Sequence, residues 1–300
     1  MSSMAKKLTL IINPAAGKGE GSAVGGRLLD MYSAAGYEYQ ALFTRTAGDA
    51  ARFAAQCNET EDVLVCVGGD GTMSETLTGL LKAKKQPPLC YVPLGSTNDL
   101  AYSLQLPMEP LEAGRLAIDG EEKWLDAGRF DEHVFSYVAS FGAFTSTSYE
   151  TDRALKNKLG HFAYVLTGAR ELPNIRAYPV RVECKEGLIE GRFLFGAVCN
   201  ASRVGGTLKL PVTQDNFCDG KLELFMVREP RDLSEIPQLL LALASGNYTH
   251  ELIECHTITQ ATFHMPEEMP WSLDGEKAMG GRRVEISALE KAYQLMMPSR

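Results

Sequence analysis

The sequence predicts a two-domain protein in which an N-terminal three-layer α/β domain precedes a mostly β domain. Between Leu8 and Val92, four short apolar runs typical of buried strands alternate with segments of helical spacing. From about Trp124 onward, short alternating or apolar runs separated by turn residues replace that pattern. Alternating strands and helices favour a parallel sheet, whereas many short strands favour a sandwich or half-open barrel.

Length and composition fit this organisation. The chain has 300 residues, of which 45% are apolar, enough for one large or two medium domains. Its 30 basic and 38 acidic residues give a net charge of −8, which argues against a nucleic-acid binder. The seven cysteines are an odd number without CxxC spacing, as expected for reduced cytosolic thiols, and neither Cys nor His pairs have zinc-ligand spacing.

The sequence contains no apolar segment long enough for a secretory signal or a membrane span. The apolar run Leu8–Ile12 is too short for a signal sequence, and the run around 239–244 is far below the ~20 residues of a spanning helix. We therefore expect a cytoplasmic protein whose contact with a membrane, if it has one, is peripheral.

The most informative stretch is the strand Val63–Val67, which is followed by Gly68-Gly69-Asp70-Gly71-Thr72 and a helix through Leu81. Glycines let backbone approach a ligand, and the N–H groups at a helix N-terminus favour phosphate. Asp70 would repel a bare phosphate, but a divalent cation between the two would remove the conflict. The pattern thus predicts a magnesium–nucleotide site; the alternative is a simple turn in which Asp70 caps the helix.

Three other predicted strands end in similar polar turns. Strand Leu8–Ile12 is followed by Asn13–Gly19, which is not a Walker loop, and then by a helix ending near Gly36. The other strands and the turns that follow them are Tyr39–Phe43 with 44–50 and a helix to Gln56, and Leu89–Val92 with 93–101. Parallel strands place such turns at one edge of the sheet, where a polyanionic ligand would bind.

The second half of the chain reads as the β-rich domain. Strand-like runs occur at 134–141, 178–184, 191–199, 221–227, 257–263 and 284–288, with helices near 153–170 and 233–245. Lys185-Glu186-Gly187 and Asp219-Gly220 are hairpin signals. We place the first domain at 1–128 and the second at 129–289, and expect residues 290–300 to pack back on the first.

Four motifs in this order resemble the diacylglycerol kinase catalytic family, most closely its soluble bacterial lipid kinases: Asn13-Pro14 with Gly17, Gly68–Thr72, Gly95–Asp99 and Ser272–Glu276. The resemblance covers nearly the whole chain, including 148–151 and 160–164. Gly-Gly-Asp-Gly-Thr alone is shared with NAD kinases and distantly with phosphofructokinases. The turn Gly-Ser-Thr-Asn-Asp and the late Asp-Gly-Glu point to the lipid branch.

The resemblance implies a Rossmann-like nucleotide-binding domain and a lipid-binding β-sandwich domain. It implies an ATP- and Mg²⁺-dependent transfer of the γ-phosphoryl group to a lipid hydroxyl, first of all that of diacylglycerol, which gives phosphatidic acid. Ala23 stands where relatives offer a basic residue, and Ser96 where a threonine is common. The positions matched to ATP contacts are Asn13, Pro14, Ala15, Ala16, Gly17, Lys18, Thr44, Gly69, Asp70, Gly71, Thr72, Met73, Ser74, Glu75, Ser96, Asn98 and Asp99.

The same resemblance assigns the catalytic base and the metal ligands. Glu276 matches the proton acceptor, although Asp274-Gly275 alone would read as a hairpin turn with Glu276 solvated. The carboxylates of Asp70, Asp99 and Asp126 are expected to converge on one Mg²⁺ or its waters; alternatively, Asp126 only turns the chain into the second domain.

A second, structural Mg²⁺ is expected at 215–221. The resemblance makes its ligands the carboxylate of Asp219 and the carbonyls of Asn216 and Lys221, and the alternative is an Asp-Gly hairpin turn.

The lipid partner is expected at a bilayer surface. Phe135, Tyr137, Phe141 and Phe144 could line an apolar acceptor cleft or belong to the core. Basic Arg153, Lys156 and Lys158 interleave with the apolar residues Leu155, Leu159, Phe162 and Tyr164, a mixture that suits anionic lipid surfaces but also a solvated helix.

Other functions stay open. Phosphatidylglycerol, a sphingoid base or an undecaprenol-like alcohol could be the acceptor, whereas an NAD kinase is disfavoured by the turn at 95–99. The rival from a different class is a nucleotide-binding regulator without turnover. Family members often form homodimers, but the sequence does not establish the oligomeric state.

Overall fold

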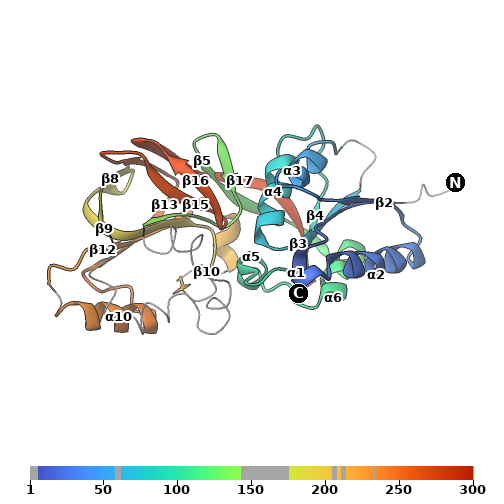
Figure 1. The fold of residues 1–300 in the computed structure, drawn as a ribbon, viewed down its shortest axis with the longest axis horizontal. Helices are drawn as coiled ribbons and strands as arrows, with labels where there is room; N and C mark the ends of the chain where they lie inside the picture. The colour runs from blue at the N-terminus through green and yellow to red at the C-terminus, as the bar shows by residue number, and fades with distance from the viewer. Residues whose placement is uncertain are drawn as a thin grey trace. The chain divides into compact units, whose positions relative to one another are not determined.

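The computed structural model describes residues 6–57, 62–142, 176–204, 208–210, 214–232 and 234–299 (Figure 1). The chain divides into two compact units. Unit 1 comprises Met1–Ala127 and Lys291–Arg300, and unit 2 comprises Gly128–Glu290. The chain passes between the units within strands β5 (Glu121–Phe130) and β17 (Arg283–Met297).

Unit 1 is built on a parallel sheet in the order β2–β1–β3–β4, with the end of β17 beside β4. Strands β1, β3 and β4 are buried on both faces, which explains why they read as continuous apolar runs. The bounds are β1 Lys7–Ile12, β2 Glu38–Phe43, β3 Val63–Gly68 and β4 Leu89–Pro93, so all four predicted strands are confirmed.

Helices cover both faces of this sheet. Helix α2 (Gly21–Ala34) packs against α6 (Pro110–Asp119), and α3 (Asp49–Ala54) packs against α4 (Asp70–Leu80) on the opposite face (Figure 1). The α3–α4 contact is so close that a Cβ on Gly79 would lie 2.0 Å from the Ala51 carbonyl oxygen. The expected three-layer α/β arrangement is therefore confirmed. Two short helices, α1 (Ala16–Gly19) and α5 (Asp99–Ser103), follow β1 and β4.

Unit 2 is mostly β, as expected. Its strands run in the order β16–β15–β7–β9–β8–β14–β17, and β12 lies between β9 and β13. The remaining described elements are β6 His133–Phe135, β7 Val138–Gly142, β8 Tyr178–Cys184, β9 Gly187–Cys199, β10 Arg203–Val204, β11 Leu208–Lys209, the 3₁₀ helix η2 Gln214–Cys218, β12 Leu222–Arg228, α10 Ile236–Ser245, β13 Ile253–Ile258, β14 Gln260–His264, β15 Met269–Leu273 and β16 Glu276–Gly280.

Two predicted strands of unit 2 are each divided in the structure. The run 134–141 forms β6 and β7, because the N–H groups of Ser136 and Tyr137 bond to a side chain instead of a neighbouring strand. The run 257–263 breaks at Thr259, where the chain changes partners from β12 to β8 and β17. The hairpin at 185–187 is confirmed, since Cys184 pairs with Gly187. The expected helix at 153–170 lies outside the described residues.

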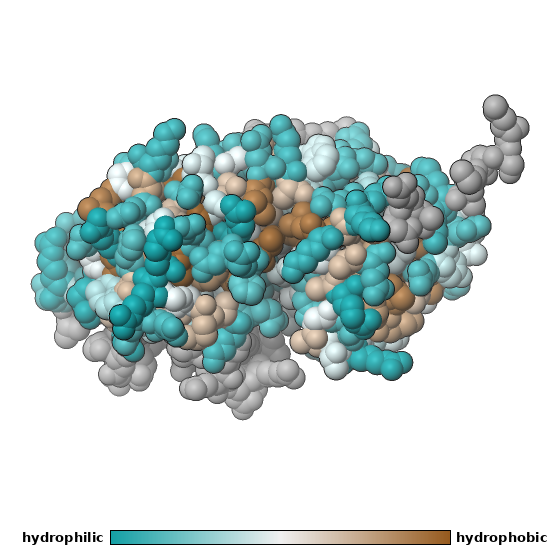
Figure 2. Space-filling model, turned by 90° about the horizontal axis from the view of Figure 1, so that it is seen from above, coloured by the Kyte–Doolittle hydropathy of each residue, from teal (hydrophilic) through white to brown (hydrophobic). Residues whose placement is uncertain are grey.

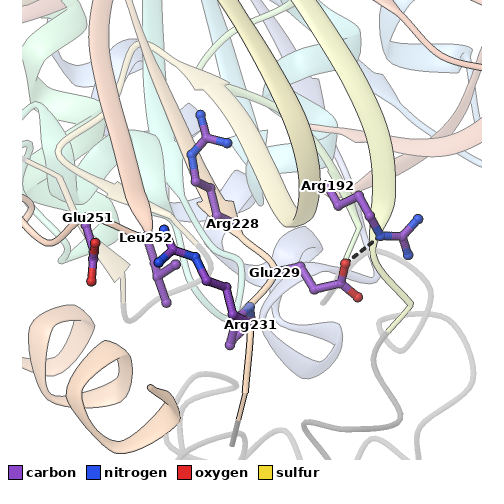
Figure 3. Close-up of a pocket in the computed structure, with 7 residues that line it drawn as sticks. Arg192, Arg228, Glu229, Arg231, Glu251 and Leu252 are labelled. Carbon is purple, nitrogen blue, oxygen red and sulfur yellow. Dashed lines mark hydrogen bonds and ion pairs between the residues drawn. The ribbon is translucent and has the colours of Figure 1, made fainter. Parts of the chain in front are cut away.

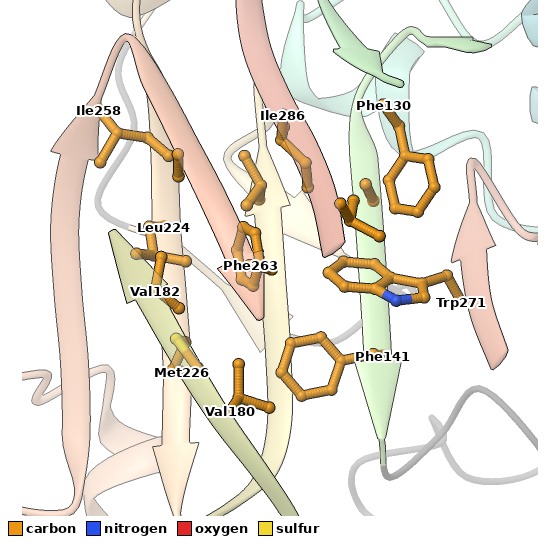
Figure 4. Packing of buried hydrophobic residues seen from close by; sticks show 14 of the residues in the cluster. Phe130, Phe141, Val180, Val182, Leu224, Met226, Ile258, Phe263, Trp271 and Ile286 are labelled. Atoms are coloured by element: carbon orange, nitrogen blue, oxygen red, sulfur yellow. The ribbon is translucent and has the colours of Figure 1, made fainter. Parts of the chain in front are cut away.

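Aromatic rings fill the core of unit 2 (Figure 4). The ring centroid of Trp271 lies 4.8 to 5.4 Å from the ring centroids of Phe130, Phe141 and Phe263. Phe135 and Phe141 are fully buried members of this core, as the core alternative expects for them. Tyr137 is also buried, and Phe144 lies outside the described residues.

Candidate functional site

The turns after β1, β3 and β4 meet at one edge of the unit 1 sheet. The N–H of Asn13 donates to the Val67 carbonyl at 2.9 Å, and the N–H of Leu94 donates to the Gly68 carbonyl at 2.7 Å. The side-chain amide of Asn13 also donates to the Thr72 hydroxyl at 3.1 Å. The parallel sheet therefore brings together the three turns in which most of the expected nucleotide contacts lie.

Two of these turns touch backbone to backbone. A Cβ on Gly95 would lie 2.7 Å from the Cα of Gly69, and a Cβ on Gly69 would lie 3.0 Å from the Cα of Gly95. Any other residue at either position would push the turns apart, because the atom it meets is backbone rather than a flexible side chain.

Asp70 sits at the centre of this edge. Its Oδ2 accepts hydrogen bonds at 3.1 Å from the Thr97 hydroxyl and from the Asp99 N–H. Its Oδ1 accepts one at 3.4 Å from the N–H of Leu100. Asp70 is the first residue of α4, yet its carboxylate faces the beginning of α5. The carboxylate thus links the turn after β3 to the turn after β4.

The surroundings of Asp70 disfavour its negative charge. Burial, followed by the nearby carboxylate of Asp99, raises the pKa of Asp70 to about 6, although its three hydrogen bonds act in the opposite direction. Asp99 itself is 1% exposed. Two adjacent buried carboxylates provide the oxygen ligands that Mg²⁺ prefers, and a cation beside them would relieve the electrostatic cost of their charges. The residues present therefore fit a magnesium ion.

The turn after β1 has an unusual backbone conformation. Gly17 and Lys18 both have a φ of 61°, in the left-handed region that residues other than glycine rarely adopt. A Cβ on Gly17 would lie 2.8 Å from the side chain of Leu94, which would have to move to make room for it. The side chain of Lys18 is exposed, which leaves its ammonium accessible to an anion.

The remaining predicted contact residues differ in what they can offer a ligand. The carboxylate of Glu75 accepts the N–H of Gly48 at 2.9 Å and so holds the turn after β2, where Thr44 lies. Ser96 is exposed, whereas the side chain of Met73 is fully buried in the core and only its backbone could face a ligand. Asn98 is buried, with its side-chain amide turned toward Gly95.

Asp126 has a different environment from the other two expected metal ligands. It is fully buried, and its Oδ1 accepts the N–H of Lys291 at 2.7 Å, which joins β5 to β17. Within the described ranges, no three His, Cys, Asp or Glu side chains come together as a metal-binding group. The structure thus places Asp70 and Asp99 side by side, and the part of Asp126 in holding the same Mg²⁺ or its waters stays a prediction.

In unit 2, Asp274 and Gly275 form the two-residue turn of a hairpin. Leu273 pairs with Glu276, and the turn residues have φ values of 50° and 89°, as a type I′ turn requires. Glu276 is exposed at the start of β16. The hairpin reading of Asp274-Gly275 is confirmed, and it leaves the carboxylate of Glu276 accessible.

The sequence interpretation missed the role of Asp274. Although it lies in a turn, Asp274 is 2% exposed, and its carboxylate accepts hydrogen bonds at 2.6 to 2.9 Å from the N–H groups of Ser136, Tyr137 and Val138. The only hint in the sequence is the Asp-Gly turn itself, which does not show that its carboxylate is buried.

The loop expected to hold a second metal is a compact turn. The carboxylate of Asp219 accepts the N–H of Lys221 at 3.0 Å, and the side-chain amide of Asn216 lies 3.4 Å from its other oxygen. Asp219-Gly220 does not connect a hairpin, since it joins the helix η2 to β12, so the hairpin expectation is wrong.

A cavity of about 610 Å³ in unit 2 contains none of the expected site residues (Figure 3). Its charged groups largely neutralise one another: Arg192 pairs with Glu229, and Arg228 pairs with Glu254. The guanidinium of Arg228 also lies over the ring of Phe193 and donates to the carbonyl of Glu190. The cavity therefore does not compete with the edge of unit 1 as a phosphate site. Its lining residues are Arg192, Arg228, Glu229, Pro230, Arg231, Glu251 and Leu252.

The basic residues Arg153, Lys156 and Lys158, and the apolar residues between them, lie outside the described residues. Across the part of the chain that the structure describes, we find no helix whose length and apolar character would let it cross a bilayer. Figure 2 shows hydrophilic side chains over most of the face it presents, with apolar residues in smaller groups.

Comparison with known proteins adds to this geometry. The profile of the diacylglycerol kinase catalytic domain matches residues 7–130. A diacylglycerol kinase of Staphylococcus epidermidis strain ATCC 35984 is 31% identical over 298 residues, which span 98% of this chain and 93% of that protein. A diacylglycerol kinase of Bacillus subtilis strain 168 is 30% identical over 273 residues, which span 90% of each chain. A crystal structure from Bacillus anthracis strain Sterne superposes with a TM-score of 0.83 at 24% identity, covering 99% of this chain and 97% of that one, and so has the same fold.

Proposed function

Because this chain belongs to the diacylglycerol kinase family and is a lipid kinase, we propose that it transfers the γ-phosphoryl group of ATP, with Mg²⁺, to the hydroxyl of diacylglycerol. The observation that carries the proposal is the carboxylate of Asp70, which is held beside Asp99 at the sheet edge where the three glycine-containing turns meet. In parallel α/β sheets, this edge is where phosphate-bearing ligands bind.

The triphosphate would lie against the turns after β1, β3 and β4. Backbone N–H groups at the start of α4, in the segment Gly69–Thr72, would face its oxygens, and the ammonium of Lys18 would add a positive charge. Asp70 and Asp99 would hold the Mg²⁺, which, when bound, spreads the charge that develops on the phosphoryl oxygens.

Glu276 would act as the general base. Its exposed carboxylate accepts the proton of the lipid hydroxyl while that oxygen forms a bond to the γ-phosphorus. The bond from the γ-phosphorus to the bridging oxygen breaks at the same time, and ADP leaves with the electron pair. The hairpin of Asp274 and Gly275 would orient Glu276, because its turn is anchored by a buried carboxylate.

The protein would bind its lipid substrate at the surface of a bilayer, with which it would associate peripherally. A homodimer and a structural Mg²⁺ at Asp219 belong to the same proposal and rest on the family resemblance. The chemistry at the edge of unit 1 does not depend on either of them.

The decisive experiment is a phosphorylation assay with γ-labelled ATP, Mg²⁺ and mixed micelles, read by thin-layer chromatography. We expect label in phosphatidic acid when diacylglycerol is offered. Phosphatidylglycerol, a sphingoid base, a polyprenol and NAD form the rest of the panel. Label in one of these, and not in phosphatidic acid, would reject diacylglycerol as the acceptor. Nucleotide binding without transfer to any acceptor would reject the kinase activity.

A further inference from the structure

In the turn after β4, the side-chain amide of Asn98 forms hydrogen bonds to the backbone of the same turn. We infer that Asn98 is a positioning residue, which fixes the place of Asp70 through Gly95 and does not itself contact the nucleotide. This inference rests on the proposed function, and it changes the role that the family resemblance gave to Asn98.

The backbone of Asn98 is in the left-handed region, with φ 48° and ψ 51°. Asparagine tolerates this conformation better than most residues other than glycine. The residue immediately precedes α5 and is 5% exposed. The conformation reverses the chain so that the first N–H groups of α5 point back toward the turn after β3.

The side-chain amide of Asn98 clamps the start of the same turn. Its Oδ1 accepts the N–H of Gly95 at 2.8 Å, and its Nδ2 donates to the Gly95 carbonyl at 3.2 Å. The hydroxyl of Tyr91 lies 3.5 Å from the same Oδ1. Both ends of the amide therefore face Gly95, which leaves little of it to recognise a ligand.

The clamp acts on Asp70 from two sides. On one side, it holds Gly95 against Gly69, the residue that precedes Asp70, at a separation that admits no Cβ. On the other side, the turn that Asn98 closes directs the hydroxyl of Thr97 and two N–H groups of α5 to the Asp70 carboxylate. Loss of the clamp would loosen both contacts at once. A displacement of about 1 Å in such a site can lower a rate by about 10²-fold.

Two substitutions separate the clamp from the backbone conformation. Asn98→Gly keeps the left-handed conformation and removes the side-chain hydrogen bonds, whereas Asn98→Ala removes them and also strains the backbone. Gln105→Gly is the matched control, since Gln105 also has a left-handed φ of 56° in unit 1 and is exposed. We expect Asn98→Gly to fold with an unfolding temperature within a few degrees of wild type.

The first readout is the binding of a non-hydrolysable ATP analogue, with and without Mg²⁺, together with kcat and the KM for lipid. Both Asn98 variants should lower kcat by about 10²-fold with an unchanged lipid KM. In both variants, the increase in affinity for the ATP analogue that Mg²⁺ causes should be at least about tenfold smaller than in wild type. In Gln105→Gly this increase should equal that of wild type. Wild-type values for Asn98→Gly, or a defect in Asn98→Ala alone, would overturn the inference.

The second readout does not require any activity. Hydrogen exchange at the amides of Gly95 and Leu100 should be faster in Asn98→Gly than in wild type, and unchanged in Gln105→Gly. Equal protection in Asn98→Gly and wild type would overturn the clamp even if the kinase activity is established. If wild-type protein binds no Mg²⁺–nucleotide, the proposed function fails, and the exchange rates still decide whether Asn98 holds the turn.

Discussion

The carboxylate of Asp274 accepts both the N–H and the hydroxyl of Ser136, at 2.6 and 2.9 Å, across 138 positions of sequence. Because the group is buried, these bonds and those from Tyr137 and Val138 compensate for its removal from water. The Asp274 carboxylate therefore ties the β15–β16 hairpin to the turn between β6 and β7.

Replacing Asp274 by alanine should destabilise unit 2. Four hydrogen bonds to one carboxylate are lost, and buried N–H groups are left without acceptors, so we expect the free energy of unfolding to fall by roughly 3 kcal/mol or more. Urea unfolding measures the change. Asp232→Ala is the control, because Asp232 bonds Ser234 in the same way but on the surface, and there the loss should stay below about 1 kcal/mol. Equal effects in both variants would contradict the buried anchor.

The parallel sheet of unit 1 could be predicted from sequence, because strands buried on both faces are continuous apolar runs such as 63–67. The strands β15 and β16 were not predicted, although Asp274-Gly275 reads as a hairpin turn, and Pro270 is a residue that disfavours a strand. The structure accommodates it because β7 pairs only with residues 271–273 of β15. Helix α6 was also missed, although Glu109 at its cap and Pro110 after it are typical start signals.

The sequence predicted the site only where the residues that form it are close together in the chain. Glycine turns after strands identify the edge near Asp70 from sequence spacing alone. The partners of buried carboxylates are not local: Asp126 bonds Lys291, 165 positions away, and Asp274 bonds a turn more than a hundred positions upstream. A short-range pattern cannot reveal such pairs, so the bond from Lys291 to Asp126 and the role of Asp274 were missed.

Glu276→Gln tests the proposed base. The amide keeps the size of the side chain but cannot accept the proton of the lipid hydroxyl, so kcat should fall by roughly 10²–10⁴-fold while nucleotide affinity is unchanged. Steady-state kinetics and titration of the ATP analogue measure both quantities. Glu268→Gln, another exposed glutamate of unit 2, should behave like wild type. Normal turnover in Glu276→Gln would exclude this residue as the base.

Asp70→Ala tests the metal-binding carboxylate. Without it, Mg²⁺ should no longer raise the affinity for the ATP analogue, and Mg²⁺-dependent transfer should be lost, because Asp99 alone offers a single carboxylate. Calorimetric titration with and without Mg²⁺ gives the comparison, and circular dichroism checks that the variant is folded. A preserved Mg²⁺ effect would show that Asp70 is not a ligand.

The raised pKa of Asp70 predicts a pH dependence of stability in the metal-free protein. Burial and Asp99 place this pKa at about 6, above its value of about 3.9 in the unfolded chain. The folded state therefore binds the proton more tightly, so the stabilising contribution is complete below about pH 4 and is lost as the pH rises through 6. Asp70→Asn lacks this titration, and its stability relative to wild type should rise between pH 4 and 7. A pH-independent difference in unfolding free energy would contradict the shifted pKa.

Gly95→Ala tests whether the two turns must touch. The added methyl would lie 2.7 Å from both the Cα of Gly69 and the Oδ1 of Asn98, so one of the turns must move and both the unfolding free energy and the Mg²⁺-dependent nucleotide affinity should fall. Gly26→Ala is the matched control: Gly26 lies in α2, and the position of an added Cβ is open space, so alanine there should stabilise the helix by about 1 kcal/mol. Thermal unfolding and analogue titration of the two variants measure these opposite effects. If Gly95→Ala were as stable as wild type and bound Mg²⁺–nucleotide normally, the close approach of Gly95 to Gly69 would not be what holds Asp70 in place.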